Sequence, residues 1–89
     1  MSPHHVGWSL VEPGWRIVDP DGNELGSVDD VLGDRDEDVF DGLSVLGGLG
    51  DRSHYVAAEQ IASIASDGTI VVQLDRAAFD QLPEPGPAR

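Results

Sequence analysis

A tight turn between two alternating apolar stretches does most to limit what this chain can fold into. Residues 14–32 read GWRIVDPDGNELGSVDDVL, with Pro20, Asp21, Gly22 and Asn23 between the two stretches. Proline presets the backbone of a turn, and Asp, Gly and Asn tolerate the positive φ angles that turns need. We therefore expect a β-hairpin. Because an isolated hairpin is marginally stable in water, further strands must bury its apolar face.

Later stretches have the composition of strands and are separated by turn residues. We expect these strands over residues 39–46, 54–57, 61–64 and 69–74. Residues 57–64 fit either a strand or a helical turn, because alanine and glutamate favour helix. Short strands with turn signals at regular spacing are typical of a small barrel or sandwich. The sequence thus predicts an all-β domain of about six short antiparallel strands.

Two glycines fall inside expected strands. Gly26 interrupts the second strand of the hairpin, which indicates a bulge or the close approach of another backbone. Near Gly42, Phe40 does not alternate cleanly with Leu43, so we expect a bulge there as well.

The two ends of the chain differ from its middle. Residues 1–13 hold two prolines and little periodicity, and we expect a flexible or loosely docked N-terminal arm whose Trp8 and Leu10 pack onto the barrel or onto a second copy. Asp75 is a good N-cap for a short helix over residues 76–82. Residues 83–89 contain three prolines and are expected to be disordered. The domain is therefore expected over residues 14–82.

Length and composition exclude several classes of protein. A chain of 89 residues forms one domain with a modest core, which association would support. The absence of cysteine excludes disulfides, thiolate metal sites and a cysteine nucleophile. Neither a signal peptide nor a run of about 20 apolar residues is present, so we expect a cytoplasmic protein without membrane insertion.

The charge is strongly negative. Seventeen acidic residues face five arginines and no lysine, a formal net charge of −12. Such a surface repels phosphate backbones, so we expect no nucleic-acid binding. Two explanations remain for this charge, namely general solubility or a basic protein partner drawn in by the complementary field.

Several short patterns in the order of this chain resemble those of a known family. The patterns are Gly14-Trp15-Arg16-Ile17-Val18-Asp19, Asp21-Gly22, Leu25-Gly26-Ser27-Val28, Tyr55-Val56-Ala57 and Asp67-Gly68-Thr69-Ile70. Over residues 14–75 the chain resembles the PRC-barrel domain. The resemblance implies a small PRC-like β-barrel used for protein contacts, without catalytic residues. Among family members, the small free-standing bacterial proteins are the most similar, although alanine stands at positions 57 and 58 where many members carry proline.

Two stretches carry possible metal ligands: the alternation of Asp19, Asp21 and Asn23, which a hairpin turn explains better, and an acidic loop. The candidates in the loop are Asp34, Asp36, Asp38 and Asp41. Carboxylates at a spacing of two are what calcium loops use. The EF-hand pattern nevertheless fails, because Val39 stands where the turn glycine belongs and Val45 where the final glutamate belongs. A solvated loop and a divalent-cation site therefore both stay open.

No pattern predicts catalysis or a cofactor. His4 and His5 lie on the arm, and His54 is expected at the surface or edge of a strand, where a dimer contact would make it pH-sensitive. The serines lack a nucleophile-elbow context. The glycine loop 47–50 lacks the lysine and following helix of a phosphate cradle. We expect no enzyme.

These observations predict a non-enzymatic protein-interaction or scaffold module that forms a homodimer. The expected interface residues are Trp8, Leu10 and Phe79, because aromatic and large apolar side chains anchor interfaces. One alternative is a divalent-cation- or ligand-responsive binding protein that uses loop 34–41. Another, resting on family analogy alone, is a factor associated with ribosome assembly.

Overall fold

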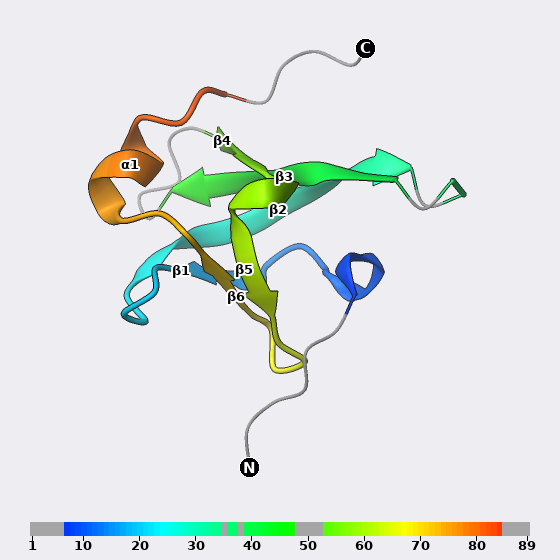
Figure 1. Cartoon of the computed structure of the whole chain (residues 1–89), viewed down its shortest axis with the longest axis horizontal. Coiled ribbons are helices and arrows are strands. Elements are labelled where there is room, and N and C mark those ends of the chain that lie inside the picture. Colours follow the sequence, from blue (N-terminus) through cyan, green and yellow to red (C-terminus); the bar gives the residue numbers. More distant parts are fainter. Residues whose placement is uncertain (1–6, 35, 38, 48–52, 85–89) are drawn as a thin grey trace.

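A computed structural model describes residues 7–34, 36–37, 39–47 and 53–84. These residues form a small all-β fold of six strands with one short α-helix near the C-terminal end (Figure 1). In chain order the elements are η1 (Trp8–Leu10), β1 (Arg16–Val18), β2 (Glu24–Asp34), β3 (Val39–Gly47), β4 (Ser53–Ala57), η2 (Ala58–Gln60), β5 (Ile61–Ile64), β6 (Thr69–Val72) and α1 (Arg76–Asp80). The fold class expected from the sequence is confirmed. Within the described residues, no helix is both long enough and apolar enough to cross a membrane.

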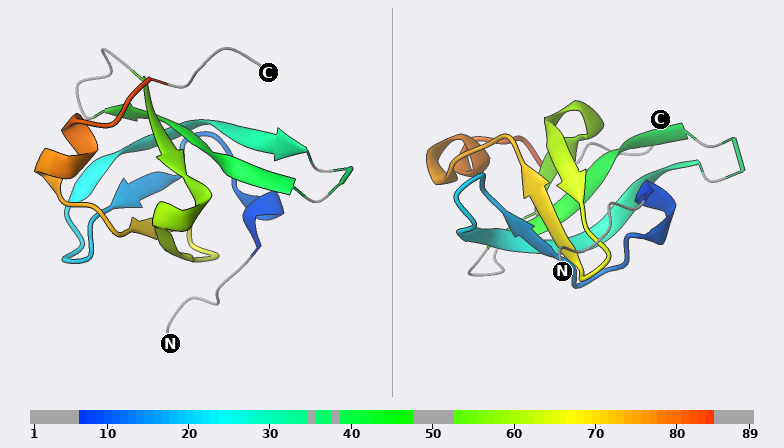
Figure 2. Two further views of the ribbon diagram at one scale, coloured as in Figure 1. Left: turned by 45° about the horizontal axis from the view of Figure 1, so that its top comes forward. Right: turned by 60° about the horizontal axis from the view of Figure 1, so that its bottom comes forward.

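All six strands belong to one sheet, in the order β4-β3-β2-β1-β6-β5. The sheet curls into a half-barrel (Figure 2). Strands β1 and β6 pair in parallel, with Ile17 opposite Ile70, whereas the other pairs are antiparallel. The expectation of purely antiparallel strands is therefore wrong for this pair. Turn signals specify only strands that follow each other in sequence, and β1 and β6 are separated by the four other strands.

The predicted first hairpin is β1–β2, and a carboxylate organises its turn. Asp19 Oδ1 accepts hydrogen bonds from the backbone nitrogens of Asp21, at 3.0 Å, and Asn23, at 2.8 Å. Gly22 adopts φ = 93°, a conformation that side chains disfavour. Asp, Gly and Asn therefore form the turn that their residue types predict.

Both glycines expected to disturb the strands do so. A Cβ atom on Gly26 would collide with the carbonyl oxygen of Leu46 on β3, so glycine permits a close backbone approach. On the same pair of strands, Leu32 pairs with Gly42 and Gly33 with Phe40. The skipped residue is Asp41, which forms the predicted bulge beside Gly42.

Residues 57–64, which fit either a strand or a helical turn by sequence, contain one of each. Ala58–Gln60 forms the 3-10 turn η2, and Ile61–Ile64 continues as β5. The Gln60 side chain closes the turn, because its Oε1 accepts the Ala57 backbone N–H at 2.9 Å. The turn carries the chain from β4, at one edge of the sheet, to β5 at the other.

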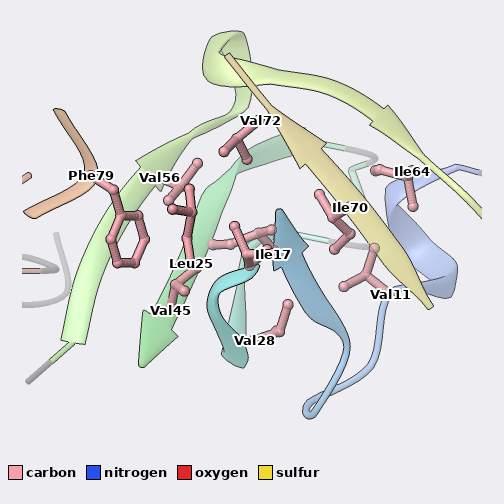
Figure 3. Packing of buried hydrophobic residues seen from close by; sticks show 11 residues of the cluster. Val11, Ile17, Leu25, Val28, Val45, Val56, Ile64, Ile70, Val72 and Phe79 are labelled. Carbon is pink, nitrogen blue, oxygen red and sulfur yellow. The ribbon is translucent and has the colours of Figure 1, made fainter. Parts of the chain in front are cut away.

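The core fills the concave side of the half-barrel (Figure 3). Its members are Val11, Ile17, Leu25, Val28, Leu43, Val45, Val56, Ile64, Ile70, Val72 and Phe79. Strands supply most of them, but Val11 comes from the expected arm and is 1% exposed. The structured part of the chain therefore begins before residue 14, because burial of this valine fixes the segment around it. Residues 1–6 lie outside the described part of the chain.

The C-terminal elements close one end of the core. Asp75 caps α1 as predicted, since its Oδ1 accepts the Ala78 backbone N–H at 2.8 Å. Beyond the helix, the carbonyl oxygen of Pro83 accepts the backbone N–H of Tyr55 on β4 at 2.7 Å. The expected disordered tail thus starts with a residue bound to the sheet, because proline lacks an N–H but keeps its acceptor. Residues 85–89 lie outside the described ranges.

Candidate interaction surface

The 3-10 turn η1 lies beside the far end of the β2–β3 hairpin (Figure 1). The Trp8 ring stacks on Phe40 of β3, with the ring centroids 5.1 Å apart and the planes 8° from parallel. Three residues later Val11 enters the core. Two apolar side chains on one short segment therefore attach it to the sheet.

Two large apolar side chains stay exposed on the two segments that carry this stacked pair. Leu10 is 57% exposed and Val39 is 48% exposed, and they are the large hydrophobic residues that the described part of the chain leaves in solvent. Leu10 shares η1 with Trp8, and Val39 precedes Phe40 on β3. We call Trp8, Leu10, Val39 and Phe40 the hairpin patch.

A groove of about 310 Å³ opens between the N-terminal segment and β2. Its lining residues are Trp8, Val11, Pro13, Asp30, Val31 and Gly33. We call it the hairpin groove. Val31 and Gly33 are two positions apart on β2, so they present the same face of the strand to it. Trp8 is the aromatic residue of the lining, and Asp30 is its one acidic residue.

The hairpin that carries this surface is acidic. Residues 29–41 contain seven acidic residues and one arginine. The described arginines, Arg16 and Arg76, are held elsewhere. Arg16 Nη2 donates to Thr69 Oγ1 at 2.7 Å, and Arg76 Nη2 donates to the Glu24 carbonyl oxygen at 3.0 Å. Neither of these two cations is bound to the acidic groups around the groove.

The candidate metal ligands do not gather into a site in the described residues. Asp34 Oδ1 accepts the backbone N–H groups of Asp36, at 2.9 Å, and Glu37, at 3.3 Å, so this carboxylate caps the turn at the tip of the hairpin. Asp41 is exposed at the bulge, and Asp38 lies outside the described residues. No group of three or more His, Cys, Asp or Glu side chains in residues 7–34, 36–37, 39–47 and 53–84 could hold a metal ion.

The most strongly bonded carboxylate of the described chain is Asp19. The backbone N–H of Asn23 holds the pKa of Asp19 below its usual range, with smaller contributions from the Asn23 side chain and the Asp21 and Gly22 backbone. Burial acts in the opposite direction and is outweighed. The alternation of Asp19, Asp21 and Asn23 is therefore a turn motif, because its first carboxylate is already committed to the backbone.

Phe79 is not an interface residue. Its side chain is 0% exposed and belongs to the core, because the apolar face of α1 turns onto the open end of the half-barrel (Figure 3). In this fold it cannot contact a partner. The prediction is corrected, whereas Trp8 and Leu10 lie at the surface described above.

His54 lies on the edge strand β4, as expected, but its side chain is buried. It is 6% exposed, and its ring packs against Phe79 with the ring centroids 4.5 Å apart. The expectation of a surface side chain fails because position 54 shares the inward face of β4 with Val56. His4 and His5 lie outside the described residues.

Sequence reasoning missed half of this surface. Val31 and Val39 fall in expected strands to which the sequence gives no other role. The break in alternation at Phe40 is the available signal, and it predicts the bulge beside Gly42. A phenylalanine out of register on a hairpin needs another partner, and Trp8 supplies it.

Comparison with known proteins adds no relative: no protein-family model matches the chain, and no curated protein is similar to it. The resemblance to the PRC-barrel domain therefore stays a prediction.

Proposed function

We propose that this protein is a non-enzymatic protein-interaction module, and that the hairpin patch and the hairpin groove form its contact surface. The observation that carries the proposal is the position of the exposed apolar side chains. Leu10 shares η1 with Trp8, and Val39 is the neighbour of Phe40 in the sequence of β3, where the two side chains point to opposite faces of the sheet. Single exposed hydrophobic residues are ordinary, but several that gather on one surface with polar groups around them are typical of interaction sites.

The composition of the patch also suits binding. Tryptophan is enriched among residues that dominate binding energy, and such residues work best in the middle of a contact that excludes water. Here the Trp8 ring is already fixed by Phe40. A partner would therefore lose little energy in ordering it.

Two further predictions from the sequence remain open. A homodimer through Trp8 and Leu10 stays a prediction, as does a cytoplasmic location. Binding of a divalent cation by loop 34–41 and a role in ribosome assembly are alternatives that no contact in the described residues favours.

The proposed function is tested by removing the exposed apolar groups. We would prepare the double variant Leu10→Ser/Val39→Ser and the control Glu59→Gln, which changes an exposed residue of η2. Light scattering after size exclusion would give the solution mass at low and high salt. A dimer near twice 9.5 kDa that the double variant abolishes would support the proposal and the homodimer together.

If the solution mass is that of a monomer, the partner must be a different protein. In that case, binding of the basic peptide described below must be lost in the double variant and kept in Glu59→Gln. The proposal is wrong if the double variant matches the wild type in both solution mass and peptide binding.

A further inference from the structure

We infer that the hairpin groove receives an arginine side chain from a basic segment of a partner protein. This inference rests on the proposed function and names the chemistry of the partner. The groove combines a fixed aromatic ring and a carboxylate, and each recognises a different part of the same side chain.

The aromatic wall is the first element of recognition. Trp8 lines the groove and is stacked nearly parallel on Phe40, with an interplanar angle of 8°. Guanidinium groups stack on tryptophan faces and are attracted by their π-electrons. Because arginine is less strongly hydrated than lysine, it loses less when it enters such a site.

The carboxylate is the second element. Asp30 lines the same groove, and its Oδ1 accepts the Val31 backbone N–H at 2.9 Å. That bond limits the rotation of the side chain, so the carboxylate is held in place before a partner binds. Carboxylates pair with the planar guanidinium fork better than with a point-like ammonium.

The size of the groove limits the occupant. Sites for drug-sized ligands occupy roughly 300–1,000 Å³, and the groove has about 310 Å³. The groove is at the lower end of that range and has room for one long side chain. The exposed Leu10, which shares η1 with Trp8, would contact an apolar residue next to that arginine.

The charge of the hairpin decides between a basic partner and a second copy. Seven acidic residues and one arginine lie within residues 29–41, and the whole chain carries −12. A second copy would bring like charge to this surface, which costs binding energy. A basic segment would instead be attracted from a distance, and its association rate would fall as salt is added.

Tryptophan fluorescence gives a direct readout. The protein has two tryptophans, and the second, Trp15, lies over Gly68 and does not line the groove. In a Trp15→Phe background, the emission of Trp8 therefore reports on the groove. The probe is a capped hexapeptide of alternating arginine and leucine, compared with peptides in which lysine or glutamate replaces arginine.

We expect saturable binding of the Arg-Leu peptide, weaker binding of the Lys-Leu peptide and none of the Glu-Leu peptide. Asp30→Asn should lower the affinity for the Arg-Leu peptide by about three- to tenfold, because it removes one charged partner of the arginine. The amide oxygen of asparagine can still accept the Val31 N–H, so the fold is preserved. The matched control Glu59→Gln removes the same charge elsewhere and should change affinity less than twofold.

Three outcomes would overturn the inference without touching the proposed function. Equal losses in Asp30→Asn and Glu59→Gln would mean that the peptide is attracted only by overall charge. Equal affinity for the lysine peptide would remove the assignment to arginine. A dimer that forms at all salt concentrations and excludes the peptide would make a second copy the occupant of the surface.

Discussion

The β2–β3 hairpin is one continuous pair of strands, but its two ends rest on different supports. At the end near the β1–β2 turn, Leu25 and Val45 are buried among residues from other strands and from α1. At the far end, Phe40 is covered by Trp8, and Val39 is 48% exposed. At the first end the buried side chains belong to the core, whereas at the second Phe40 stacks on Trp8 of the short N-terminal segment.

One end of the β2–β3 hairpin therefore serves mainly folding, and the other is available for binding. Removal of atoms from the core end leaves a cavity that many neighbours share, so its cost is global. Removal of atoms from the far end changes the surface and has a smaller effect on the free energy of unfolding. We therefore expect substitutions at the two ends to differ in what they change as well as in how much.

The largest expected effect is at the core end. Leu25→Ala should lower the free energy of unfolding by about 2–5 kcal/mol, because it opens a cavity in a fully packed core. For a domain this small, such a loss is a large part of the total stability. Urea unfolding followed by circular dichroism measures it. A loss below about 1 kcal/mol would mean that the core end is no better supported than the far end.

A smaller effect is expected from the far end. Phe40→Ala should cost about 1–2 kcal/mol, less than the ~3–5 kcal/mol of a fully buried phenylalanine, because this side chain is half-buried and stacks on one partner. Urea unfolding gives the value, and a change in Trp8 emission confirms that the stack is lost. A cost equal to that of Leu25→Ala would contradict the proposed separation.

The Asp19 turn, at the core end, should make the stability of the protein depend on pH. Because the pKa of Asp19 is lowered in the folded protein, its stabilising effect is fully present above the ordinary value of 3.8 and is lost as pH falls through the lower folded value. Asp19→Asn should therefore be less stable than the wild type at pH 6, with a smaller difference at pH 3. Melting temperatures at both pH values test this. An unchanged difference would mean that the charge of Asp19 contributes nothing.

The smallest effect on stability is expected at Leu10, at the far end. Leu10→Ser should change the free energy of unfolding by no more than about 0.5 kcal/mol, because the side chain is 57% exposed. The same substitution should weaken partner binding. Urea unfolding and the fluorescence titration, performed on one preparation, compare the two. A large loss of stability would make Leu10 a packing residue.

The sequence predicted local structure better than long-range pairing. The residues of the Asp19 turn, the bulge at Gly42 and the capping Asp75 act through neighbours in sequence, and each is found as expected. The parallel pairing of Ile17 with Ile70 depends on strands far apart in the chain. No local signal encodes that pairing, so it could not be predicted.

The sequence also predicts only part of the candidate surface, because its local pattern does not show which segments meet in space. Trp8 and Leu10 stand out because they are large apolar residues in a polar segment. Phe79 looked equivalent to them, but a short amphipathic helix directs its apolar face to the core whenever a strand edge and an open barrel end are near. Val39 stands out only because the structure leaves it 48% exposed, which its place in a strand pattern does not specify.

The hydrogen bond from Tyr55 to Pro83 has a consequence for aggregation. Strand β4 is at one edge of the sheet, and such edges can recruit strands from other molecules into growing fibrils. Pro83 occupies an acceptor position beside that edge and, having no N–H, offers no donor through which pairing could continue. A proline so placed ends the sheet instead of extending it, and a chain shortened after Leu82 should therefore be more prone to polymerise.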